Sequence, residues 1–220
     1  MATIPAGILG HFTGKAGNII GYIRNGKNFV RSRPRKSNMP ASPARLVQQQ
    51  KIKVCGEFTT AFSGSGFFNT TFPAYGHSGT GYNRATSAIM NLAITGAYPN
   101  TAIAYPQVLI SKGPLPGAQN ASATASSEGL IVFNWEDNTG TGTAKENDKV
   151  VVVAYFPSEK RAIFNIGIAL RKDGQAILNT QQMQGLTAET WIGFLSHDEK
   201  VGTGRDLSLL SVRDLPYRRK

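Results

Sequence analysis

The residues of this sequence that could act together chemically are cations near its N-terminal end. Residues 1–53 hold ten lysines and arginines and no carboxylate side chain, whereas residues 54–220 hold 14 basic and 13 acidic residues. Basic side chains neutralise phosphate groups, and arginine adds a planar fork of donors that matches phosphate oxygens. Seven cations ahead of residue 42 are therefore candidates for polyanion binding or subunit contact: Lys15, Arg24, Lys27, Arg31, Arg33, Arg35 and Lys36.

Two aromatic residues, Tyr22 and Phe29, lie among these cations in the sequence. Aromatic rings interleaved with positive charge can stack on the bases of nucleic acid. The same cations also suit an acidic surface on a neighbouring subunit, and a solvated basic face is the third interpretation. The sequence leaves DNA or RNA and a second copy of the chain open as partners.

Catalytic and metal-binding patterns are scarce in this sequence. His11, His77 and His197 lie far apart, without the close spacing of zinc ligands. The run 197–199, His-Asp-Glu, is more typical of a solvated turn than of an acid–base group, and the glycine-lysine pairs lack the spacing of a phosphate-binding loop. We therefore predict no catalytic residue, no metal and no cofactor, identify no small-molecule substrate, and expect the chain not to be an enzyme.

The cysteine count and the length of the apolar runs help to predict the cellular location of the protein. Cys55 is the only cysteine, so no disulfide can form within the chain, and we expect its side chain to be buried. The sequence does not open with the charged and apolar regions of a signal peptide, and its apolar runs are too short to cross a membrane. These patterns predict no membrane partner and a location in the cytoplasm, or release without an N-terminal signal peptide.

The elements that would position the cations begin with a predicted β-hairpin. Residues 18–24 and 27–32 are rich in β-branched and aromatic residues, and Asn25-Gly26 between them suits a type I′ turn. Glycines at positions 10, 14, 17 and 21 indicate tight turns or close backbone approach. Because an isolated hairpin is marginal in water, this one must pack against the body or against another chain. Residues 33–43 contain three prolines and are expected to be an extended connector.

Two helices are predicted after the connector. Ser42-Pro43 is a favourable helix start, with serine as the N-cap and proline at the first helical position, and the helix is expected over residues 43–61. A second helix is expected over residues 83–94, where apolar residues recur at near-helical spacing. Residues 63–81 carry no assignable pattern.

The second half of the sequence reads as strands. Turn-rich breaks separate apolar or alternating runs at residues 108–110, 130–135, 149–156, 161–170, 190–195 and 207–212. Short strands at such intervals are typical of an immunoglobulin-like sandwich of about seven strands. The expected fold is α+β, with a basic N-terminal β-hairpin arm, two helices and a C-terminal antiparallel immunoglobulin-like β-sandwich. The expected regions are an arm and connector at 1–41, a helical region at 42–104, the sandwich at 105–216 and a basic tail at 217–220.

Several motifs of the sequence form a distinctive set: residues 12–22, Asn25-Gly26-Lys27, Arg31-Ser32-Arg33-Pro34, and the stretches 94–100 and 108–113. These motifs resemble an uncharacterised bacterial family, a domain of unknown function found in Bacteroidota. The resemblance covers almost the whole chain and implies no activity, so no catalytic residue is carried over. Arms of this Gly-Lys-x-Gly and Arg-x-x-Pro style also look like those of some phage-associated proteins.

The function expected from these observations is structural and non-enzymatic. A marginal hairpin and the exposed edges of a small sandwich favour self-association, with the arm contacting a neighbouring subunit. The alternative is a nucleic-acid-binding protein that uses the basic arm. A carbohydrate-binding module that uses Trp135 and Trp191 is the second alternative, although their apolar surroundings favour core packing.

Overall fold

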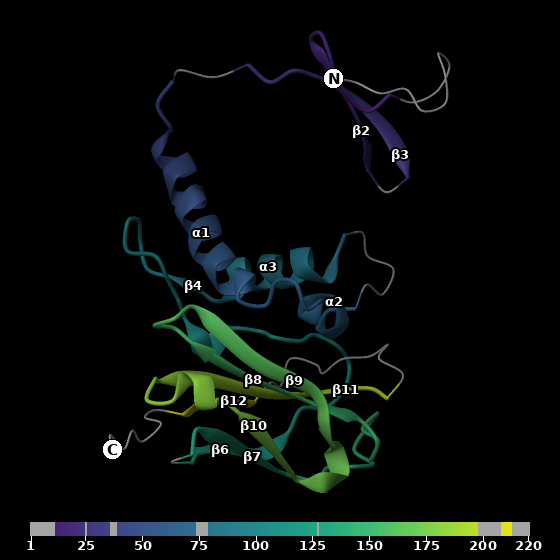
Figure 1. Cartoon of the computed structure of the whole chain (residues 1–220), viewed down its shortest axis with the longest axis vertical. Coiled ribbons are helices and arrows are strands. Elements are labelled where there is room, and N and C mark those ends of the chain that lie inside the picture. The colour runs from purple at the N-terminus through teal and green to yellow at the C-terminus, as the bar shows by residue number, and fades with distance from the viewer. Residues whose placement is uncertain are drawn as a thin grey trace. The chain divides into compact units, whose positions relative to one another are not determined.

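The computed structural model describes residues 12–24, 26–35, 39–73, 79–126 and 128–197, together with the backbone of residues 208–212 (Figure 1). The chain divides into two units, the first ending at Ser42 and the second beginning at Pro43. Its mixture of α-helices and antiparallel sheets confirms the mixed class expected from the sequence. Among the described residues, no helix is both long and apolar enough to span a membrane.

The first unit contains a three-stranded antiparallel sheet. Its strands are β1 (Gly14–Ala16), β2 (Ile19–Arg24) and β3 (Lys27–Ser32), and β2 lies in the middle. The sheet includes the hairpin expected around Asn25-Gly26, because Arg24 lies opposite Lys27 at the turn. Gly26 adopts φ +72°, the left-handed conformation that this turn requires, while Asn25 lies outside the described residues. Strand β1 had not been expected.

The second unit begins with helices α1 (Pro43–Thr60), α2 (Phe67–Thr71) and α3 (Gly81–Leu92). Thr80 caps α3, because its hydroxyl oxygen accepts a hydrogen bond from the backbone N–H of Asn83 at 3.3 Å. The expectation of two helices is therefore wrong for the described chain, which holds three. The additional helix α2 is only five residues long, too short to show a helical period.

Three antiparallel sheets complete the second unit in its described part. The smallest pairs β4 (Ile94–Thr95) with β5 (Ala102–Ile103). A three-stranded sheet has the order β10-β7-β6, from Gln175–Asn179, Leu130–Glu136 and Gln119–Ala125. A four-stranded sheet has the order β12-β11-β8-β9, from Ser208–Val212, Ala188–Leu195, Lys149–Phe156 and Arg161–Leu170. Short 3₁₀-helices occupy Tyr105–Gln107, Arg171–Asp173 and Gln181–Met183.

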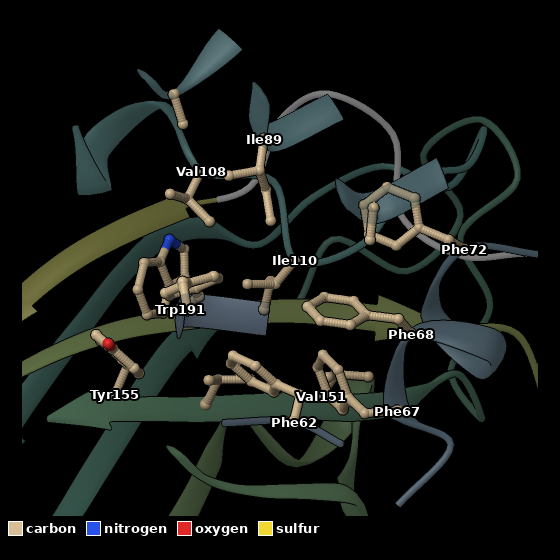
Figure 2. Packing of buried hydrophobic residues seen from close by; sticks show 14 of the residues in the cluster. Phe62, Phe67, Phe68, Phe72, Ile89, Val108, Ile110, Val151, Tyr155 and Trp191 are labelled. Carbon is tan, nitrogen blue, oxygen red and sulfur yellow. The ribbon is translucent and has the colours of Figure 1, made fainter. Parts of the chain in front are cut away.

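The strand expected at residues 108–110 is not present. This segment follows the first 3₁₀-helix and is not assigned to a strand, although Val108 and Ile110 are almost fully buried. The two side chains fill the core between the helices and the four-stranded sheet (Figure 2). Burial in a packed core, rather than strand pairing, therefore accounts for this apolar run.

One hydrophobic cluster joins the helices to the four-stranded sheet. Phe58 and Phe62, with Phe67 and Phe68 of α2, pack with β8 and β11 residues that include Trp191 (Figure 2). The Phe58 ring lies edge-on to the Trp191 ring, with 6.1 Å between their centroids. Because these residues come from both the region expected to be helical, 42–104, and the region expected to be a sandwich, 105–216, the helices and the strands share one core.

A second cluster joins the four-stranded sheet to the three-stranded sheet. Val150, Val152 and Ala154 of β8 pack here with β7 and β10, whereas Val151 and Val153 belong to the first cluster. Strand β8 is therefore buried on both faces, which explains its nearly continuous apolar sequence. In its described part, the second unit contains a helical layer, a four-stranded sheet and a three-stranded sheet, besides the small β4–β5 sheet (Figure 1).

Candidate binding faces of the N-terminal sheet

The strand register places most of the predicted cations on one face of the N-terminal sheet. Residues that lie opposite each other in neighbouring strands share a face, and successive residues alternate between faces. Arg24 is opposite Lys27, Tyr22 is opposite Phe29, and Ile20 is opposite both Arg31 and Lys15. We call this side the cation face and define it by Lys15, Tyr22, Arg24, Lys27, Phe29 and Arg31.

The centre of the cation face is an exposed aromatic pair. The rings of Tyr22 and Phe29 are stacked, with 5.5 Å between their centroids and 20° between their planes. Their exposed fractions are 39% and 41%. The guanidinium carbon of Arg31 lies 5.7 Å from the centroid of the Tyr22 ring, at cation–π distance. A stacked aromatic pair thus lies among exposed positive charges, and residues 1–56 contain no carboxylate side chain that could neutralise them.

The opposite side of the same sheet carries no charged side chain. We call it the apolar face and define it by Ile19, Ile23 and Val30, which are 43%, 47% and 60% exposed. Gly21 is also on this side, and a Cβ atom built there would overlap the carbonyl oxygen of Phe12 and lie 2.8 Å from its ring. Phe12 therefore packs over Gly21, and only glycine permits this approach.

The sheet has almost no core of its own. Gly21 is the only buried residue among the described residues of the first unit. Every residue of β3 is exposed, and β3 pairs with β2 alone in the described part of the chain. Three short strands without buried side chains offset little of the conformational entropy that is lost when the sheet becomes ordered. The expectation that another surface covers this sheet stays a prediction.

The seven predicted site residues fall into three groups. Lys15, Arg24, Lys27 and Arg31 come together on the cation face. Arg33 and Arg35 follow β3 and are exposed, and the backbone N–H of Arg33 donates to the carbonyl of Asn18 at 2.7 Å. Lys36 lies outside the described residues. The binding role of all seven stays a prediction.

Sequence reasoning missed the apolar face. The signal was available, because a two-residue Asn25-Gly26 turn fixes the register of the strands around it. Counting outward from that turn places Ile23 and Ile19 on the side opposite Tyr22 and Arg24. The glycine interpretation, in contrast, is confirmed at three positions: Gly14 and Gly17 have positive φ, and Gly21 is in close contact with Phe12.

Cys55 is buried in α1, as expected. Its thiol lies 3.6 Å from the carbonyl oxygen of Thr86, and burial raises the pKa of this thiol to about 11. A thiol with that pKa is almost wholly protonated at neutral pH and is a poor nucleophile. His197 is exposed in a turn, and the other two histidines, with Asp198 and Glu199, lie outside the described residues.

The buried charges of the second unit form a structural cluster. Arg171 and Asp148 are both fully buried, and Nε of the arginine lies 3.1 Å from a carboxylate oxygen of the aspartate. The Nε1–H of Trp135 donates to the backbone carbonyl of Arg171 at 2.7 Å. Trp135 and Trp191 are buried, which confirms the expected core packing. Across the described residues, no group of three or more His, Cys, Asp or Glu side chains could hold a metal ion.

A groove of about 1180 Å³ lies beside α3 in the second unit. Its lining combines apolar residues, among them Phe72, Leu92 and Leu109, with the cations Arg84 and Lys112. Its described lining contains no carboxylate. The groove has the size of a ligand site, and the polar side chains of Ser87, Asn91 and Gln107 also line it.

Comparison with known proteins identifies a family without an assigned function. The model of a family of unknown function, DUF6266, matches residues 11–204. No curated protein is detectably similar to the chain. Solved structures that overlap with it include the crystal structure of the FN1–FN3 domains of chicken CNTN1, at 12% identity and a TM-score of 0.35. That overlap covers 46% of this chain and 33% of the CNTN1 chain.

Proposed function

We propose that this chain, which belongs to the DUF6266 family, is a non-enzymatic structural protein whose N-terminal sheet contacts a second copy of the chain. One observation carries the proposal: the sheet exposes Ile19, Ile23 and Val30 together on one face and buries almost nothing of its own. Exposed apolar residues gathered on one side of a sheet mark an interaction surface.

The charge distribution favours another copy as the occupant of the apolar face. Ile19, Gly21, Ile23, Asn28, Val30 and Ser32 share this side, and none of them is charged. Two copies can therefore meet through this face without placing like charges opposite each other. In a symmetric contact, each apolar residue is buried once in each of the two copies. The cations of both copies would then point away from the contact.

The energy available from this contact is modest. Burying a whole Ile or Val side chain is worth about 1.5–3 kcal/mol, so the exposed half of each of the three contributes about 1 kcal/mol. A symmetric pair gains about 6 kcal/mol, whereas association costs about 4–15 kcal/mol, so these three residues alone leave little net binding energy for a dimer. We therefore expect self-association to become pronounced where many copies meet and several such contacts act together.

The second unit suits a scaffold role in this proposal. Strands β6 to β12 form two sheets that share a hydrophobic cluster, and we propose that they make an immunoglobulin-like sandwich with the helices packed on its outer side. The carbohydrate-binding alternative gains no support, because Trp135 and Trp191 fill the core instead of lining a surface.

Light scattering coupled to size-exclusion chromatography tests the proposal over a range of protein concentrations. The natural chain should pass from monomer to larger species, and a chain lacking residues 1–41 should stay monomeric. The double variant Ile23→Thr/Val30→Thr keeps β-branched residues but should also stay monomeric. Its matched control is Arg31→Thr, which alters the residue beside Val30 on the opposite face. A natural chain that stays monomeric throughout would overturn the proposal.

A further inference from the structure

We propose that the cation face of the N-terminal sheet binds single-stranded nucleic acid, a function separate from self-contact through the apolar face. The two functions can coexist, because the faces lie on opposite sides of the same three strands. The proposal rests on the arrangement of the cations, on the stacked aromatic pair between them and on the lack of acidic residues in the arm.

The cations lie at both ends of the aromatic pair. Arg24 and Lys27 are beside the turn, and Arg31 and Lys15 lie on either side of Ile20 at the other end. Ile20 and Arg24 are four residues apart along β2, which corresponds to about 13 Å of strand. A flexible phosphate backbone that crosses the sheet along this line would meet positive charge before and after the rings.

The aromatic pair favours single strands over duplex. Every base has a flat face that stacks on an exposed aromatic ring, so such binding tolerates many sequences. In a duplex the bases are already stacked on each other, and the rings of Tyr22 and Phe29 would have nothing to stack against. Cations alone would bind both forms through phosphate contacts, so the rings account for the expected preference.

A nucleic acid explains the face better than an acidic protein surface does. Carboxylates would pair with the four cations but would make no use of two stacked rings at about 40% exposure. The rings would then be an exposed apolar feature within the most basic part of the chain. Bases and phosphates together match both kinds of side chain on this face.

The test measures binding of the full-length chain to labelled oligonucleotides by fluorescence anisotropy, at concentrations where the chain is monomeric. The probes are a single-stranded DNA, an RNA of the same sequence and the corresponding DNA duplex. Single strands should bind more tightly than the duplex. With four cations engaged, affinity for the DNA single strand should fall about 50-fold between 50 and 200 mM salt.

Variants of the two rings separate stacking from charge. Tyr22→Leu/Phe29→Leu keeps every cation and should weaken single-strand binding at least about tenfold while leaving duplex binding unchanged. Tyr22→Phe keeps both rings and should bind like the natural chain, which shows that a substitution at this position does not by itself weaken binding. Ile23→Thr/Val30→Thr alters only the apolar face and should also bind normally, so failure of the proposed self-contact is distinguishable from failure of this proposal.

Four results would overturn the inference. One is tighter binding to the duplex than to the single strand, and another is unchanged binding when both rings become leucine. The third is displacement of the oligonucleotide by polyglutamate as effectively as by unlabelled single strand, which would indicate an acidic protein partner. Absence of binding at 50 mM salt counts equally against the cation face as a nucleic-acid site.

Discussion

Replacing Arg171 by methionine should destabilise the chain severely without affecting either face of the N-terminal sheet. Arg171 is fully buried, and its guanidinium contacts Asp148, the side-chain oxygen of Asn138 and the carbonyl of Pro116. The guanidinium carbon also lies 3.7 Å from the centroid of the Phe194 ring. The Arg171 side chain thus contacts four other segments of the second unit, so we assign it a role in stability.

The expected loss in the free energy of unfolding follows from the carboxylate of Asp148, which Arg171→Met leaves without its partner. A methionine side chain would fill much of the space, but the carboxylate of Asp148 would stay buried without a compensating cation. It would keep the hydrogen bond from the backbone N–H of Lys145, at 2.9 Å. Breaking a buried ion pair on one side costs about 3–5 kcal/mol. The net stability of a domain is only about 5–15 kcal/mol, so Arg171→Met should remove a large share of it.

Urea denaturation followed by the fluorescence of the two buried tryptophans measures this loss. Adding Asp148→Asn to Arg171→Met removes the unpaired charge, so the double variant should be more stable than Arg171→Met alone. A loss below about 1 kcal/mol in Arg171→Met would refute the structural role assigned to the pair. So would a double variant that loses the full sum of the two single losses, because the pair would then be uncoupled.

Two further predictions concern other parts of the chain. Burial raises the pKa of the Cys55 thiol from 9.0 to about 11, so the unfolded chain loses this proton at a lower pH than the folded chain. The free energy of unfolding should therefore decline between about pH 9 and pH 11, and it should decline less steeply in Cys55→Ala. Urea titrations at a series of pH values measure this decline, and equal declines in the natural chain and the variant would contradict the prediction. Gly21→Ala should displace Phe12 from the sheet and speed chymotrypsin cleavage after Phe12, whereas an unchanged rate would mean that the contact is dispensable.

The parts of the fold that the sequence predicts well carry strong local signals. Ser42-Pro43 marks the start of α1, and Asn25-Gly26 sets the hairpin, because turn and cap residues restrict the backbone by themselves. Strands β8 and β9 match their predicted limits, since long apolar or alternating runs leave few other ways to bury them.

The missed elements depend on contacts that sequence patterns do not show. Helix α2 is held by phenylalanines that pack into a core built from β8, β9 and β11. Strand β6 is made of small and polar residues, and it forms a strand because its backbone pairs with the edge of β7. The run at 108–110 has strand-like composition, but the core buries it without strand pairing. In each case tertiary packing overrides the local preference.

The two-sided character of the N-terminal sheet reconciles the two functions that the sequence left open. Burying the cation face against protein would desolvate Lys15, Arg24, Lys27 and Arg31, and the arm has no carboxylate to pair with them. Leaving the apolar face in water forfeits the burial of Ile19, Ile23 and Val30. Covering the apolar face while the cation face stays toward solvent or a polyanion avoids both costs, and this is the orientation that we propose. Net positive charge therefore does not by itself choose between subunit contact and nucleic-acid binding, because the strand register separates the apolar residues from the cations, so that each proposed function can use its own face.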